Sequence, residues 1–149
     1  MKYHQRDIVE IDFPIPGEGY KVHPALIVSN DELQLDEGFV YVALISSQDF
    51  DYSRHYAYPL TDEMLSFKME KQSYVKCQIL AVTVDTGILR RLGSIKERYF
   101  NEIVDKIVDS IFWHNHALLY NDIKQLERQY RINKGKRTTT IKSGQKHEF

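Results

Sequence analysis

The chain has 149 residues, of which 42% are hydrophobic and 28% are charged. This composition fits one globular domain with a sizeable core and excludes a disordered or fibrous protein. No apolar run is long enough to cross a bilayer, and Met1 is not followed by the hydrophobic region of a signal peptide, so we expect a cytoplasmic protein. The single cysteine, Cys77, excludes an internal disulfide and has no metal-ligand spacing.

Charge is distributed unevenly along the chain. The net charge is −1, but residues 131–149 hold six Lys or Arg and one Glu, which leaves −6 for the remainder. An acidic body is not typical of a domain that binds nucleic acid over its whole surface. A polyanion would therefore bind in a local basic groove or on the tail, residues 133–149, which we expect to be disordered.

The N-terminal third predicts two strands. Residues 7–13 alternate between apolar and polar, which is typical of a half-buried strand. Residues 14–21 contain two prolines and two glycines and predict a loop without regular structure. Pro24 then fits the first residue of a strand, and residues 25–28 are all apolar, which indicates burial on both faces. His23 would lie directly before this strand, at the mouth of a small barrel.

The next stretch alternates between apolar runs and polar connections. A nearly continuous apolar run predicts a third strand at 39–45, and Pro59 places the next strand, 54–60, at a sheet edge. The remaining segments read as a polar connection at 33–38, a helical turn capped by Thr61 at 61–65, one long strand or two with a bend at 72–83, a turn at 86–87 and a short helical turn at 88–92.

The C-terminal part predicts helices. Ser94 and Glu97 have the spacing of a capping box, and apolar residues recur behind them at helical intervals up to Ile111. We therefore expect an α+β, mainly β fold: a small antiparallel barrel over residues 1–113, covered by a long amphipathic helix. After a break at His114, residues 114–132 predict a helical extension, whose apolar face we expect to support dimerisation or a partner.

Several segments together resemble the MazF/PemK-like toxins of toxin–antitoxin systems. The matching segments are Asp-Ile-Val-Glu-Ile-Asp-Phe at 7–13, Pro-Ala-Leu-Ile-Val-Ser-Asn-Asp at 24–31, Val-Ala-Leu-Ile-Ser-Ser-Gln at 42–48, Val-Lys-Cys-Gln-Ile at 75–79 and Arg-Leu-Gly at 91–93. The resemblance implies an SH3-like barrel of the MazF/PemK/CcdB type. It also implies a homodimer that cleaves single-stranded RNA without a metal, and a labile antitoxin that binds the same surface.

The resemblance also indicates where the site lies and where this chain departs from the family. Active members carry an Arg before the Pro-Ala-Leu strand and a Thr or Ser at the end of the third strand. This chain keeps the hydroxyl as Ser46 but has His23 at the Arg position. Leu80 replaces a second family Arg, Thr83 replaces a carboxylate, and Arg6 replaces the Gly before the first strand.

Metal-free RNA cleavage needs proton transfer and donors for the phosphorane. An imidazole suits proton transfer because its unperturbed pKa of ~6.5 is near neutrality, so we assign catalysis to His23, with Ser46 bonding the phosphate. Loss of two Arg predicts a weakened enzyme, unless Lys21, Arg54 or Lys76 compensates. The residues predicted to bind RNA are Tyr20, Lys21, Ser47, Gln48, Arg54, Lys76 and Gln78. We expect no cofactor and no metal, because His114 and His116 do not share a helix face.

The same residues also allow interpretations without catalysis. His23 can be a strand-end residue whose ring satisfies a backbone group. Ser46 and Ser47 can be turn residues, and Gln78 can satisfy buried backbone groups. The alternative to a nuclease is therefore a non-catalytic module on the same fold that binds a protein or RNA.

Overall fold

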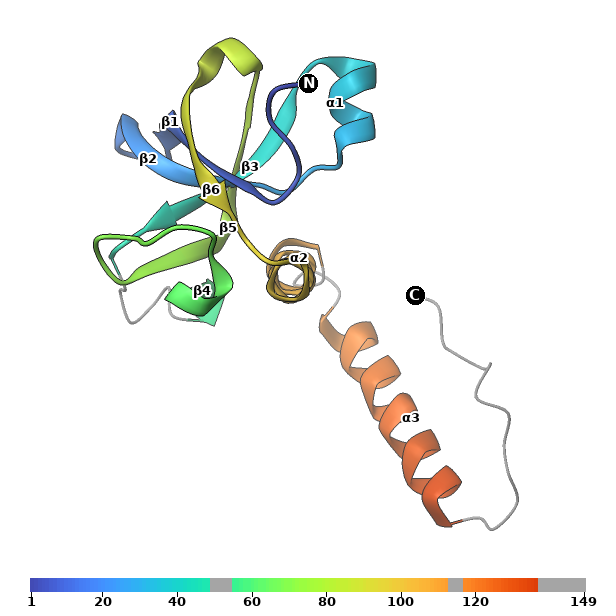
Figure 1. Cartoon of the computed structure of the whole chain (residues 1–149). Coiled ribbons are helices and arrows are strands. Elements are labelled where there is room, and N and C mark those ends of the chain that lie inside the picture. The colour runs from blue at the N-terminus through green and yellow to red at the C-terminus, as the bar shows by residue number, and fades with distance from the viewer. Residues whose placement is uncertain (49–54, 113–116, 137–149) are drawn as a thin grey trace. The chain divides into compact units, whose positions relative to one another are not determined.

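The computed structural model describes residues 1–48, 55–112 and 117–136 (Figure 1). The chain divides into two compact units, Met1–Phe112 and a second unit that begins at Trp113. Within the second unit, helix α3 (Ala117–Lys136) continues four residues into the range predicted as a tail. None of the helices in the described ranges has the length and apolar composition that a membrane span requires.

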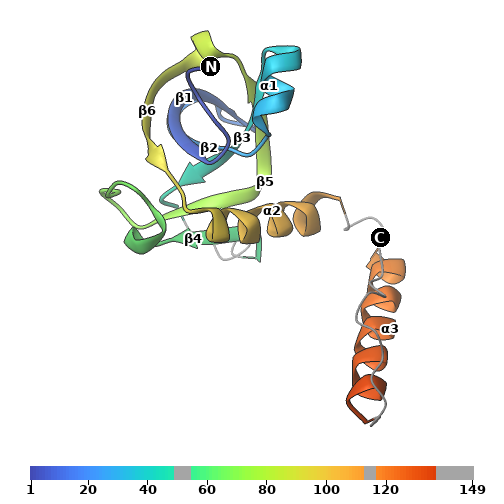
Figure 2. The ribbon, with the colours of Figure 1, turned by 45° about the vertical axis from the view of Figure 1, so that its right-hand side comes forward.

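A curved antiparallel sheet of six strands forms the first unit (Figures 1 and 2). The strand order is β4-β5-β3-β2-β1-β6. With the helices α1, α2 and α3, this confirms a mainly β, α+β fold. The strands are β1 (Asp7–Ile15), β2 (Gly19–Ile27), β3 (Val40–Ser46), β4 (Ala57–Leu60), β5 (Ser73–Thr83) and β6 (Ile88–Ser94).

A tight hairpin joins β1 and β2, so the prediction of an irregular loop over 14–21 is wrong. The Glu18 N–H donates to the Ile15 carbonyl at 3.0 Å, and Gly17 has a φ of 77°. Proline presets the first central position of a type II turn and glycine supplies the positive φ at the second, as Pro16 and Gly17 do here. The two strands therefore continue to the turn itself.

Strand β2 changes its surroundings along its length. It pairs with β1 throughout but with β3 only from Ala25 to Ile27, where the side chains are fully buried as predicted. Pro24 lies in the middle of the strand, not at its first residue as predicted, and immediately precedes the pairing with β3. This position suits a residue without an N–H, because at Pro24 the strand has a ladder partner on one side only.

Two hydrophobic clusters lie on opposite faces of the sheet. Successive residues of β1 enter different clusters, Ile8 in one and Val9 in the other. Helix α2 (Glu97–Ile111) covers the first cluster with Phe100, Ile103 and Ile107, which are buried (Figure 2). The apolar stripe predicted for this helix is thus confirmed as its packing face.

Helix α1 (Asp31–Glu37) occupies the range predicted as a polar connection. The Asn30 side chain accepts a hydrogen bond from the Leu33 N–H at 2.8 Å, and Gly38 ends the helix with a φ of 77°. Asparagine before a helix and glycine after it are both common end signals. These two residues were the sequence signal for this helix.

Strand β6 replaces the helical turn predicted at 88–92. Its register with β1 shifts twice, so Leu89 and Leu92 have no partner on β1. The predicted capping box is also wrong, because Lys96 precedes α2 and makes no side-chain cap. Ser94 instead ends β6, where its N–H donates to Ser66 Oγ at 2.9 Å.

The remaining predictions on the first unit hold in outline. Residues 72–83 form one strand, β5, with a register shift between its pairs with Ala43 and Leu44. Strand β4 lies at the sheet edge, as Pro59 predicted. Thr61 precedes the 3-10 turn η2 (Asp62–Met64) but makes no capping hydrogen bond.

Replacing Arg6 by glycine should stabilise the fold. Arg6 has a φ of 77°, and its backbone is held there by hydrogen bonds to Ile27 and Ile95, both at 3.0 Å. A left-handed backbone costs an L-residue about 1–2 kcal/mol, which glycine avoids. Part of this gain is cancelled, because glycine has greater conformational freedom in the unfolded chain. We expect Arg6→Gly to raise the free energy of unfolding by about 0.5–1 kcal/mol in urea titrations. Arg6→Ala should give no gain, since it keeps the Cβ.

Acid should weaken the attachment of the N-terminal segment to α1. The Asp31 carboxylate accepts hydrogen bonds from the Gln5 N–H at 2.8 Å and from His4 Nδ1 at 2.7 Å. The Gln5 bond and then the His4 bond lower the pKa of Asp31. Stabilisation by the ionised carboxylate is therefore complete above about pH 4 and is lost as the pH falls through the folded pKa. Because the Asp31 carboxylate is partly exposed, we expect its ionisation to contribute less than about 1 kcal/mol to the free energy of unfolding.

Urea unfolding of the wild type and of Asp31→Asn between pH 6 and pH 3 measures this effect. The wild type should be the more stable protein at pH 6, and the difference should shrink towards pH 3. A difference that is constant over this range would contradict the assignment.

Candidate functional site

Two grooves meet where β3 ends at Ser46. Beyond this residue β2 continues to Gly19 without pairing to β3. One groove has a volume of about 230 Å³ and the other about 500 Å³, and His23 and Ser46 line both. The structure therefore brings the two residues predicted as catalytic to the junction of two concave surfaces.

His23 is half-buried, and one ring nitrogen is already engaged. Its Nδ1 lies 3.2 Å from the Ile45 carbonyl oxygen. A carbonyl can only accept, so Nδ1 carries the hydrogen in this contact, and Nε2 of the neutral ring keeps its lone pair. The contact is the structural role foreseen for His23, and it also fixes the tautomer that can accept a proton at Nε2.

Ser46 is held by its own turn. Its Oγ accepts a hydrogen bond from the Gln48 N–H at 3.2 Å. The hydroxyl hydrogen is not used in this bond, and a hydroxyl donates and accepts at the same time. Ser46 can therefore donate to an oxygen of a ligand in either groove.

The smaller groove contains four of the residues predicted to bind RNA. They are Lys21, Gln48, Lys76 and Gln78. Lys76 is buried, and its ammonium lies 5.7 Å from the centre of the Tyr74 ring. The Gln78 Oε1 is buried and has no hydrogen-bond partner among the described residues, so this oxygen accepts no hydrogen bond from a backbone N–H there. A buried acceptor without a partner is costly, which makes this oxygen a candidate contact for a ligand.

The other predicted RNA-binding residues are not gathered into this groove. Ser47 lines the larger groove. The Tyr20 side chain lines neither groove and is 72% exposed. Arg54 lies outside the described residues. Leu80, which we predicted to replace a second family Arg, is partly buried against the hydrophobic cluster under α2.

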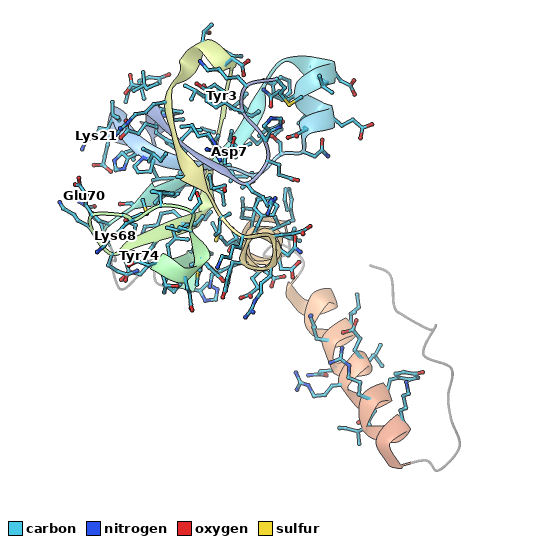
Figure 3. The ribbon with its side chains drawn as sticks, viewed as in Figure 1. Tyr3, Asp7, Lys21, Lys68, Glu70 and Tyr74 are labelled. Carbon is cyan, nitrogen blue, oxygen red and sulfur yellow. The ribbon has the colours of Figure 1, made fainter. Side chains whose placement is uncertain are left out.

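The larger groove also contains charged residues that the sequence did not reveal. They are Glu10, Lys68, Glu70, Lys71 and Arg90. Figure 3 shows the Lys68 and Glu70 side chains on the segment between η2 and β5. Arg90 Nε and Nη2 donate to the two oxygens of Glu10 at 2.8 and 3.1 Å, and this hydrogen bonding lowers the pKa of Glu10.

Only the strand register joins Glu10 and Arg90, which are 80 residues apart in sequence. The two residues are direct partners in the β1–β6 ladder. The Arg-Arg pair at 90–91 was the available sequence signal, but it could not be used while this segment was predicted to be helical. Within the described residues, no three His, Cys, Asp or Glu side chains come together as possible metal ligands.

Comparison with known proteins assigns the family. Residues 4–111 match the model of the PemK-like, MazF-like toxins of type II toxin–antitoxin systems. A search of curated proteins finds no match. The fold is similar to a mycobacterial endoribonuclease in complex with its cognate antitoxin, with a TM-score of 0.57 and 16% identity, covering 72% of this chain and 93% of that chain.

Two further solved structures have the same fold. The Mycobacterium tuberculosis toxin MazF-mt6 gives a TM-score of 0.56 at 17% identity and covers 70% of this chain and 95% of its own. A MazE–MazF structure from Deinococcus radiodurans gives a TM-score of 0.56 at 14% identity, with 73% and 95% covered. The chain therefore belongs to the PemK-like, MazF-like toxin family of type II toxin–antitoxin systems.

Proposed function

We propose that this chain is a toxin that cleaves single-stranded RNA without a metal ion. The observation that carries the proposal is that a proton acceptor and a hydrogen-bond donor both line the junction of the two grooves. His23 is fixed by Ile45 so that Nε2 can accept a proton, and the Ser46 hydroxyl can donate beside it. An RNA strand that passes from one groove to the other would carry a phosphodiester past both side chains.

The reaction is a transesterification within the RNA. His23 Nε2 takes the proton of the ribose 2′-hydroxyl, the 2′-oxygen attacks phosphorus, and the bond from phosphorus to the 5′-oxygen breaks. The imidazolium then returns its proton to the leaving oxygen. The products are a 2′,3′-cyclic phosphate and a 5′-hydroxyl. Ser46 donates to a non-bridging oxygen, while Lys21, Lys76 and Gln78 hold the strand in the smaller groove.

The rate should be lower than that of members with both family arginines. Neither His23 nor Leu80 supplies the fixed charge and forked donors of an arginine. Loss of one preorganised donor costs about a hundredfold in rate. A slow nuclease is therefore the form of activity that these residues support.

The proposal extends to assembly and partners. The protein would act in the cytoplasm as a homodimer, inhibited by a small antitoxin. Solved complexes of similar toxins with an antitoxin support the antitoxin as a partner. The sheet would close into the SH3-like barrel of the family, which the bridge between Leu65 and Ile95 supports. The extension at 114–132 would serve dimerisation or a partner, in line with the exposure of Leu126.

A non-catalytic module that binds protein or RNA is the second candidate. The observation in its favour is that both departures from the family have structural roles here. The His23 ring is bonded to a backbone carbonyl, and Leu80 packs on the core. A module that only binds would need neither proton transfer nor a second arginine.

Incubation of chelator-treated protein with a long single-stranded RNA separates the two candidates. Cleavage with 2′,3′-cyclic phosphate and 5′-hydroxyl ends supports the nuclease. Absence of cleavage supports the binding module. Cleavage that persists in both His23→Ala and Ser46→Ala would contradict the site assignment while leaving the activity itself in place.

A further inference from the structure

The Glu10–Arg90 pair is organised in the way a guanidinium binds a phosphate. Two nitrogens of Arg90 face two oxygens of Glu10 at 2.8 and 3.1 Å. Carboxylate and phosphate groups both present two oxygens at the spacing of the guanidinium fork, so they compete for the same donors. The Arg90 side chain is 66% exposed, whereas that of Glu10 is 26% exposed. A ligand can thus reach the guanidinium more easily than the carboxylate.

The pair lies in the groove that contains the proposed catalytic residues. Glu10 and Arg90 line the larger groove together with His23 and Ser46. Lys68 and Lys71 line the same groove and Glu70 is the further acid, so the groove is rich in cations once Glu10 is set aside. In the sheet, Glu10 on β1 pairs with Pro24 of β2 on one side and with Arg90 of β6 on the other. Glu10 is therefore the direct neighbour of the residue that follows His23.

We propose that Arg90 binds a phosphate of single-stranded RNA and that Glu10 is an internal competitor which the phosphate displaces. The identity of the ligand rests on the proposed function, whereas the competition rests on the geometry. In the free groove, Arg90 is bonded to Glu10. A phosphodiester takes over the two donors, and the Glu10 carboxylate turns to solvent or to a neighbouring lysine. Arg90 thereby supplies, from β6, a forked cation in a groove where position 23 offers only an imidazole.

Competition predicts changes of opposite sign at the two positions. Glu10→Gln removes the competing charge and should tighten binding by about threefold, since an exposed ion pair is worth at most about 1 kcal/mol. Arg90→Ala should raise the Kd about tenfold, in line with a lost charge-assisted hydrogen bond. It should also reduce the slope of log Kd against log salt concentration by about 0.7. Without Arg90, Glu10→Gln should tighten binding less than it does in the wild type, because the carboxylate then occupies no guanidinium.

Binding is measured on the full chain with a fluorescent single-stranded 2′-deoxy oligonucleotide, which lacks the attacking hydroxyl and cannot be cleaved. Arg98→Ala is the matched control. Arg98 lies on α2 against the Tyr99 ring, 4.8 Å from its centre, and should leave both the Kd and the salt slope unchanged. Urea unfolding of each variant shows whether a change in binding reflects the fold.

The inference is overturned if the wild type does not bind the oligonucleotide, if Glu10→Gln weakens binding in a folded protein, or if Arg90→Ala leaves the salt slope unchanged. These results are independent of the cleavage assay. Binding with the predicted signs by a protein that cuts no RNA would retain the anion site and reject the nuclease. Cleavage with an unchanged slope in Arg90→Ala would do the reverse.

Discussion

Replacement of His23 by alanine should lower the rate of RNA cleavage by about 10²–10⁴-fold, the usual contribution of a positioned general acid or base. The reason is the fixed tautomer. The bond from Nδ1 to the Ile45 carbonyl directs the basic nitrogen away from the backbone, and alanine has no group that can take the proton. The assay is single-turnover cleavage of a long single-stranded RNA, with a chelator present throughout.

Two further substitutions make this experiment specific. His55→Ala is the matched control, because His55 is exposed and lines neither groove, and it should retain the wild-type rate. His23→Arg introduces the arginine that the family resemblance implies at this position, and the charge of arginine does not titrate near neutrality. It should flatten the dependence of the rate on pH. A His23→Ala variant that is folded and cuts at the wild-type rate would remove His23 from the mechanism.

Replacement of Asp7 by alanine should cost about 2 kcal/mol of stability. Asp7 is 5% exposed, and its two oxygens have separate partners. Oδ1 lies 3.1 Å from Arg91 Nε, and Oδ2 accepts the His4 N–H at 2.9 Å. Alanine would leave a guanidinium and a backbone donor without their acceptor. The midpoint of thermal unfolding should fall on the order of 10 °C.

The control for Asp7 comes from the same strand. Asp12 lies on β1 but is exposed, and Asp12→Ala should change the free energy of unfolding by less than about 0.5 kcal/mol. Asp7→Asn keeps the shape of the side chain and should fall between the two. Equal stabilities of Asp7→Ala and Asp12→Ala would show that the bonds of the Asp7 carboxylate contribute no net stability.

Periodicity predicted the parts of the fold in which the period is unbroken. Strand β1 alternates regularly until its turn, and α2 repeats its apolar residues at helical spacing, so both were identified. Strand β6 was mistaken for a helical turn because bulges at Leu89 and Leu92 interrupt its alternation. The apolar residues then fall three and four positions apart, as they do on a helix. A bulge depends on the partner strand, so the local sequence cannot reveal it.

The prediction of helix ends failed for a different reason. The residues that signal a helix end are also the residues that signal a turn. Asn30 and Gly38 mark the two ends of α1, but residues 33–38 were interpreted as a polar connection. Ser94 and Glu97 had the spacing of a capping box, yet the backbone of Ser94 is engaged by Ser66 and by β1. The tertiary hydrogen bonds decided which of two local possibilities was used.

The candidate site was predictable where it follows neighbouring strands. His23 and Ser46 lie where β2 and β3 part, and Lys76 is paired with Leu44 of β3, so these side chains gather in one place. Glu10 and Arg90 could not be predicted, because their contact needs the shifted register of β1 with β6. Tyr20 follows the turn of the hairpin and lies away from both grooves.

The exposure of β2 has a consequence for how this family can diverge. Residues 19–22 of the strand are exposed, His23 and Pro24 are half-buried, and residues 25–27 are fully buried. The buried half of the strand therefore serves folding, and the exposed half is available for ligand binding. Selection can exchange the side chain at position 23 without disturbing the buried half. A substitution at position 23 can thus alter or abolish activity while the fold persists.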